Sequence, residues 1–243
     1  MGEELLRKER EFLIPGEKIV ESMNYLPGKN CFREGNSIYA KRIGLLSVTN
    51  RVVSIIPLNS VYMPKVGDMV IAEVEDIQSN GWILDIKSPS YAYLPLSGIR
   101  EFIDTSKTDL SKVYDIGDAL YVKIVSANSS GSIHVAMTDS RCRKFTGGII
   151  ISINPAKVPR LIGRQGSMIN LIKEKTKCKI SVGQNGIIWL QGEYEDIAVQ
   201  AIKLVEEEAV VEGLTDKIAA FLTKKSIEGK SKGKSAAKPE RGR

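Results

Sequence analysis

The segment from Leu161 to Ile169, LIGRQGSMI, restricts the fold of this 243-residue chain more than any other segment. It places two glycines, Gly163 and Gly166, between two helical patterns. Residues 155–162 precede the glycines, and residues 167–176 follow them with apolar side chains on one helical face. The pattern predicts two helices joined by a short turn that only glycine-rich backbone can form.

Such a turn is suited to binding phosphate. Neither glycine has a Cβ, so a phosphodiester backbone can approach the main chain, and the free amides of the second helix attract negative charge. With an isoleucine on each side, the segment resembles the I-G-x-x-G-x-x-I motif of KH domains, whose GXXG loop holds about four nucleotides against an apolar groove. The resemblance implies RNA-binding roles for Ile162, Gly163, Arg164, Gln165, Gly166, Ile169 and the nearby Lys173. The alternative is an ordinary corner between two helices.

A second G-x-x-G, at Gly183–Gly186, has strand-like flanks instead of helical ones. It contains Asn-Gly, the pair that favours tight β-hairpins. This copy is therefore predicted to be a hairpin turn without a role in phosphate binding.

The charge of the chain is sorted by segment. Residues 141–179 contain ten basic residues and one acid, whereas residues 193–216 contain eight acids and one lysine. The basic window surrounds the first G-x-x-G, so a polyanion is expected to dock there. Three of its members, Arg141, Arg143 and Lys144, form a basic joint that is a further candidate RNA contact.

The net charge of +6 arises in the C-terminal tail, where residues 224–243 contain eight basic residues and two acids. This Lys/Gly/Ser-rich segment has no apolar periodicity, and we expect it to be disordered. Two interpretations stay open: the tail adds salt-sensitive attraction to RNA, or it is only a solvated end.

The expected fold class is multidomain, mainly β plus α/β. Residues 1–62 form a small β-rich domain, residues 63–140 a five-stranded OB-type barrel, and residues 147–222 a KH domain. The last of these has the order strand, helix, GXXG, helix, strand, strand, helix, which is the type I (eukaryotic-type) KH topology. Residues 223–243 form the basic disordered tail. In the closing helix, residues 194–212, the expected buried face carries Ile197, Ala201, Leu204 and Val205.

The barrel resembles S1-type RNA-binding domains in the segments VGDMVIAEV (66–74) and GWILDI (81–86). Family S1 domains use two aromatics, a histidine, an aspartate and an arginine on their binding face. Here those positions hold Asn80, Ile83, Pro95, Asn128 and Ser132. Stacking is worth about 1–3 kcal/mol per base, so their loss argues against strong base binding by this barrel alone.

Alternation along the barrel strands separates core residues from candidate RNA contacts. Trp82 is in phase with Leu84 and is expected to pack in the core or between domains. Tyr93, Lys123 and His134 alternate outward and are candidate RNA contacts, although a plain surface histidine explains His134 equally well.

The composition bounds other classes of function. No apolar run approaches the roughly 18 residues of a membrane span, and the charged start is not a signal peptide. Three distant cysteines, Cys31, Cys142 and Cys178, indicate neither a disulfide framework nor a zinc site. We therefore expect a cytoplasmic protein that needs neither cofactor nor metal. 

A nuclease is disfavoured for a similar reason. Glu73, Glu75 and Asp76 form a cluster of acids, but the sequence offers no second acidic group with the pattern of a two-metal catalytic site. The chain also contains a single histidine. The expectation is that the protein is not an enzyme.

A β-rich domain followed by one S1 barrel and one KH domain resembles the S1/KH RNA-binding cap subunits of the archaeal RNA exosome. The resemblance covers residues 12 to about 221. It implies that three copies sit on a ring of RNase PH-like subunits, docked through their N-terminal domains. They would bind single-stranded RNA 3′ regions, with a preference for adenosine-rich tails, and guide them to the pore for 3′–5′ degradation. Two alternatives stay open: an S1/KH adaptor in translation or ribosome maturation, and a purely structural assembly subunit.

Overall fold

A computed structural model describes residues 5–100, 109–128, 131–209, 211 and 213–235, with side chains described as far as Lys224. The chain divides into two compact units, with the division after Ser60. Each unit has apolar cores of its own.

The N-terminal unit is built from two small sheets around one core. The first sheet has the order β1 (Phe12–Leu13), β6 (Gly44–Thr49), β7 (Val52–Pro57) and β3 (Leu26–Pro27). The second has the order β2 (Lys18–Glu21), β5 (Ser37–Ala40) and β4 (Cys31–Glu34). Leu13, Ile38, Leu46 and Val53 are completely buried in this core. The unit is β-rich, as its short apolar runs predicted.

The second unit begins with a closed five-stranded barrel. Its strands are β8 (Met69–Gln78), β9 (Gly81–Asp85), β10 (Ala92–Pro95), β11 (Ala119–Ala127) and β12 (Ile133–Ala136). They pair in the order β12-β10-β9-β8-β11, and the additional pairing of β12 with β11 closes the barrel. Two 3-10 turns, η1 (Leu96–Gly98) and η2 (Leu110–Lys112), lie in the connection after β10. The OB-type barrel predicted from strand alternation is confirmed.

The basic joint is part of the barrel sheet. Arg143 and Lys144 form strand β13, which pairs antiparallel with β11 through Tyr121 and Leu120. The sequence predicted a linker here, because two polar residues beside a cysteine show no strand periodicity. Edge pairing needs only free main-chain groups, so it overrides the weak local signal.

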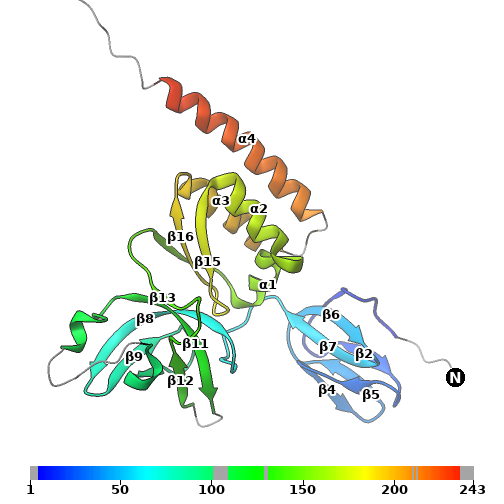
Figure 1. Ribbon diagram of the computed structural model, residues 1–243. Helices are drawn as coiled ribbons and strands as arrows, with labels where there is room; N and C mark the ends of the chain where they lie inside the picture. The colour runs from blue at the N-terminus through cyan, green and yellow to red at the C-terminus, as the bar shows by residue number, and fades with distance from the viewer. Residues whose placement is uncertain (1–4, 101–108, 129–130, 210, 212, 236–243) are drawn as a thin grey trace, which may run out of the picture. The chain divides into compact units, whose positions relative to one another are not determined.

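The KH fold follows directly. Strand β14 (Ile149–Ser152) leads through η3 (Pro155–Lys157) into helix α1 (Val158–Ile162), the turn η4 (Arg164–Gly166) and helix α2 (Ser167–Thr176). Strands β15 (Cys178–Val182) and β16 (Ile187–Gly192) precede helix α3 (Glu195–Glu207), and the antiparallel sheet has the order β14-β16-β15. Figure 1 shows α1, α2 and α3 gathered beside this sheet. The predicted order of elements is confirmed.

Two details of the helices differ from expectation. The buried face of α3 carries Ala198, Ala201, Ile202 and Val205, whereas Ile197 and Leu204 are only partly buried. The predicted buried face lies about one position away from the observed one. The difference arises because α3 also packs against α4. Helix α4 spans Leu214–Ser235 and continues well past residue 222, where the KH domain was expected to end.

The length of α4 changes the expectation for the tail. Ile218 and Leu222 anchor the first turns in the KH core, and the following Lys, Ser and Glu residues tolerate a helix once it is nucleated. The first part of the segment predicted to be disordered is therefore helical, and residues 236–243 lie outside the described part. None of the helices described here is long and apolar enough to cross a membrane.

A hydrogen-bonded turn joins the barrel to the KH fold. Gly183–Gly186 connects β15 to β16, as the hairpin prediction required, and inserts Asn185 against the barrel. The Asn185 amide nitrogen donates to the carbonyls of Ile71 (2.7 Å) and Ile86 (2.9 Å), and its oxygen accepts from the Ile71 N–H at 3.3 Å. A Cβ on Gly183 would lie 2.8 Å from the Ile71 nitrogen, so this approach requires glycine.

Candidate nucleic-acid interface

The GXXG turn has the backbone of a phosphate clamp. Gly163 and Gly166 have φ values of 74° and 79°, and Gln165 between them is also left-handed, with φ 51°. A Cβ on Gly163 would come within 2.8 Å of the Met168 nitrogen, so both space and conformation require glycine there. Arg164 and Gln165 are exposed at the tip of the turn.

Helix α2 begins at this turn without a side-chain cap, because its N-cap residue is Gly166. The amides of a first helical turn have no partner within the helix, and they attract anions. Arg164 adds a positive charge beside them. The predicted clamp residues are therefore brought together, and their contact with RNA stays a prediction.

A groove of about 440 Å³ lies beside the clamp. Its apolar part is formed by Ile162 and Ile169, which flank the glycines, and by Ile180 and Val182 of β15. The rest of the lining comes from the barrel side, from α2 and from β15: Tyr121, Ser140, Arg141, Arg143, Lys173 and Ser181. Among the residues that the structure describes, the groove lining has three cations and no acidic side chain, and the basic joint and the KH motif meet in one place.

Arg143 is fixed by contacts with both parts of the unit. Its guanidinium carbon lies 5.2 Å from the centre of the Phe145 ring and 5.6 Å from that of the Trp189 ring. Its Nη2 donates to the Ser181 hydroxyl at 2.8 Å. These contacts hold the positive charge beside the groove.

Lys173 is partly buried on α2. Burial lowers the pKa of its ammonium, and the neighbouring Arg143 charge lowers the pKa further. Both causes follow from a cation that has lost water and lies near another cation.

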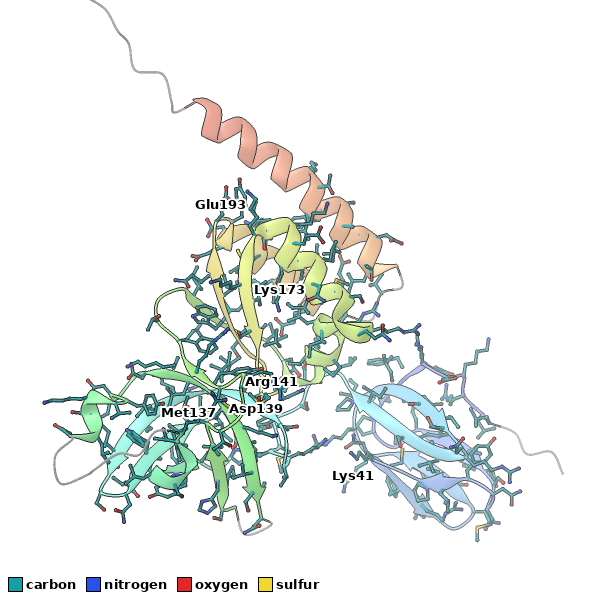
Figure 2. The ribbon with its side chains drawn as sticks, viewed as in Figure 1. Lys41, Met137, Asp139, Arg141, Lys173 and Glu193 are labelled. Atoms are coloured by element: carbon teal, nitrogen blue, oxygen red, sulfur yellow. The ribbon has the colours of Figure 1, made fainter. Side chains whose placement is uncertain are left out.

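Three other predicted contacts are already paired with acids. Arg141 binds Asp139 through two bonds, Nε to Oδ1 at 3.0 Å and Nη2 to Oδ2 at 3.1 Å, and Lys123 lies 3.5 Å from the same carboxylate. These hydrogen bonds, led by the one from Arg141, hold the pKa of Asp139 well below its usual range. Figure 2 shows Asp139 and Arg141 side by side, with Lys173 above them in this view.

Lys144 is the third paired cation, and it makes an ion pair with Asp118. Pairing with acids reduces the charge that these side chains offer to a polyanion. Within the groove, Arg143 and Lys173 are thereby distinguished from the paired Arg141.

Tyr93 and His134 form a separate aromatic pair on β10 and β12. Their rings meet edge to face with centroids 5.9 Å apart, and the His134 Nε2 lies 3.3 Å from the Ser132 hydroxyl. Both side chains are partly exposed, as strand alternation predicted, but neither lines the groove.

Trp82 is completely buried, as predicted from its phase on β9. Its Nε1 donates to the Tyr114 carbonyl at 2.9 Å, and the two rings meet edge to face at 5.2 Å. Trp82 is therefore a core residue and is not available for stacking on bases.

The acids Glu73, Glu75 and Asp76 are all exposed on β8. The register with β9 shifts between Val74 and Asp76, so the alternation of side chains along β8 is interrupted here. Within the described ranges, no three His, Cys, Asp or Glu residues are grouped so that they could hold a metal ion.

Two features of the interface were not predicted from the sequence. One is the insertion of Asn185 into the barrel, and the other is the stack of Phe145 on Trp189, with centroids 4.5 Å apart. The Asn-Gly turn signal predicted the hairpin correctly, but contacts between segments distant in sequence have no local signature.

Comparison with known proteins agrees with this arrangement. A family model described as "KH domain" matches residues 148–207, and one described as "RRP4, S1 domain" matches residues 61–121. The first match contains the clamp, and the second contains the start of the barrel.

Similarity to whole proteins extends over most of the chain. The chain is 42% identical over 220 residues to exosome complex component Rrp4 of Methanothermobacter thermautotrophicus, and the match covers 90% of this chain and 70% of that protein. It is 39% identical over 226 residues to exosome complex component Rrp4 of Methanothermus fervidus, covering 92% of this chain and all of that protein. A crystal structure described as an exosome complex RNA-binding protein superposes with a TM-score of 0.63 at 34% identity, covering 70% of this chain and 99% of that one.

Proposed function

This chain belongs to the Rrp4 family of exosome complex components, and on that premise we propose that it is a non-catalytic RNA-binding subunit of an exosome. It binds single-stranded RNA 3′ regions and guides them to the pore of an RNase PH-like phosphorolytic ring. The ring carries out 3′–5′ degradation, and this chain supplies the grip.

The observation that carries the proposal is the groove beside the clamp. Apolar side chains next to uncapped helix amides suit the bases and phosphates of a single strand, and an acid-free lining suits a polyanion. A duplex would present its phosphates outside and its bases paired, so the groove fits single strands better.

The clamp and groove residues carry most of the proposed grip: Ile162, Gly163, Arg164, Gln165, Gly166, Ile169, Lys173 and Arg143. The paired cations Arg141, Lys123 and Lys144 make weaker, salt-sensitive contacts. Tyr93 and His134, whose rings meet edge to face, form a second aromatic surface that RNA can contact. The barrel then mainly shapes the path of the strand.

The proposed assembly rests on what membership of this family implies. Three copies are proposed per ring, each docked through its N-terminal unit, and adenosine-rich 3′ tails are the proposed preferred RNA. The proposed location is the cytoplasm.

Two experiments test the function. The purified chain should bind labelled poly(A) without shortening it when phosphate and Mg²⁺ are supplied; shortening by rigorously purified protein would contradict the non-catalytic role. Purification of the chain from its native cell should bring RNase PH-like subunits with it. Recovery of ribosomal subunits instead would favour the adaptor function, and recovery of the ring without RNA binding by the chain would favour a purely structural subunit.

A further inference from the structure

The groove has two chemically different parts. Beside the clamp it is apolar, through Ile162 and Ile169, and beside the barrel it is cationic, through Arg143 of β13 and Lys173 of α2. Arg143 lies outside the KH fold, which begins at β14. A ligand that fills the whole groove therefore contacts both domains of the second unit.

Arg143 is pre-organised to bind an anion. The Phe145 and Trp189 rings and the Ser181 hydroxyl restrict the guanidinium, so little side-chain entropy remains to be lost on binding. A guanidinium has five N–H donors, and the bond to Ser181 uses one of them. The others are suited to the paired oxygens of a phosphate.

Lys173 supplies a second charge in the same groove. Both side chains line this groove, and burial followed by the Arg143 charge lowers the pKa of Lys173. Among the described residues, no acid lies within ion-pair distance of either one. An anion bound between two such cations offsets both their repulsion and their partial loss of water.

We infer that Arg143 and Lys173 together hold one phosphate of single-stranded RNA, beyond the nucleotides held by the GXXG clamp. The inference rests on the proposed function, because it extends the same bound strand. It makes the RNA site a composite of the KH fold and the β13 strand of the barrel sheet. The grip on RNA then depends on the docking of the two domains against each other.

The test measures binding of an oligoadenylate of about eight nucleotides, roughly twice the length that a GXXG loop holds, to the full chain over a range of salt concentrations. Arg143→Gln and Lys173→Gln should each weaken binding about tenfold, because each removes a charge-assisted contact. Each should also lower the salt slope by about 0.7, the value per phosphate contact for single strands. Lys175→Gln, an exposed lysine on the same helix, is the matched control and should change affinity little.

The double variant tests whether the phosphate is shared. Its loss of affinity should be smaller than the product of the two single losses, because both side chains act on one group. Multiplicative losses, or single losses no larger than that of Lys175→Gln, would overturn the inference. Lys173→Gln leaves the Phe145–Trp189 stack intact, so its result counts even if Arg143→Gln lowers the melting temperature.

A clamp variant separates this inference from the proposed function. Arg164→Asp with Gln165→Asp places negative charge at the exposed tip and keeps both glycines. If this variant loses RNA while the Arg143 and Lys173 variants bind normally, the function stands and the shared phosphate site is wrong. If no variant changes affinity, RNA does not use the groove, and both the shared phosphate site and the placement of RNA on the clamp are wrong.

Discussion

The indole of Trp189 stacks on the ring of Phe145, with centroids 4.5 Å apart and planes 15° apart. Trp189 belongs to the central strand of the KH sheet, whereas Phe145 directly follows the edge strand of the barrel sheet. Both rings are buried, and the indole Nε1 donates to the Gly147 carbonyl at 2.7 Å. This stack ties the two domains together and forms the surface on which Arg143 rests.

Removing the indole should therefore weaken both stability and RNA binding. Trp189→Ala creates a cavity in the interface and should cost about 3–5 kcal/mol in the free energy of unfolding, measured by denaturant titration. RNA affinity should fall as well, because Arg143 loses its support. Trp189→Phe keeps a stacking ring and should retain most of the affinity. Equal affinity for wild type and Trp189→Ala would show that the stack does not position Arg143.

Substitution of Asn185 should lower the melting temperature more than substitution of its exposed neighbour Gln184. Asn185→Asp replaces an amide that donates to two carbonyls by a carboxylate that can only accept, and it leaves both carbonyls without that donor. Each unsatisfied buried group costs about 1–3 kcal/mol, so a clear drop in melting temperature is expected. Gln184→Ala is the control, since Gln184 is exposed and its bond to Met69 is made by the main chain. A melting temperature as high as that of the control would contradict the role assigned to Asn185.

The barrel, the KH order and the clamp could be predicted because their signals are local. Strand alternation placed Trp82 in the core, and the spacing of two glycines between helical patterns placed the turn. The distribution of charged residues along the sequence located the basic window but did not distinguish its members from one another. Only the fold shows that Arg141 and Lys144 are paired with acids while Arg143 lies against aromatic rings. The partners Asp118 and Trp189 are distant in the sequence, and the partners only two residues away, Asp139 and Phe145, form no pattern that predicts these contacts.

The charge on Asp139 should restrain RNA binding. Asp139→Asn removes the negative charge that pairs with Arg141 and Lys123, so RNA affinity should rise and its salt slope should steepen. The pKa of Asp139 is lowered in the folded protein, so the stability from this carboxylate is present above about pH 4, the ordinary unfolded value, and is lost as pH falls through the lower folded value. From pH 5 to 8 the wild-type pairing should therefore not titrate. An affinity that rises from pH 8 to pH 5 in wild type but not in Asp139→Asn would contradict this assignment.

The lowered pKa of Lys173 predicts a pH dependence on the alkaline side. Lys173 should lose its proton below the ordinary lysine value of about 10.4, so its contribution to RNA binding is present at neutral pH and is lost as pH rises through that lowered value. Affinity of the wild type should fall earlier on the alkaline side than that of Lys173→Arg, whose charge persists. Salt concentration is held constant, and Lys175→Arg serves as control. Coincident pH profiles for wild type and Lys173→Arg would exclude Lys173 from the phosphate contact.

The clamp itself is best tested between its glycines. Replacing Gly163 would place a Cβ 2.8 Å from the Met168 nitrogen at a positive φ, so a loss of binding could reflect misfolding alone. Arg164→Asp with Gln165→Asp avoids this, because both positions are exposed and Asp tolerates the left-handed backbone of Gln165 better than most residues. The free energy of unfolding should change little. RNA affinity should fall at least tenfold, because two negative charges face the phosphates in place of one positive charge. A folded double variant that binds RNA as wild type does would mean that the GXXG turn serves packing and that the strand is held elsewhere.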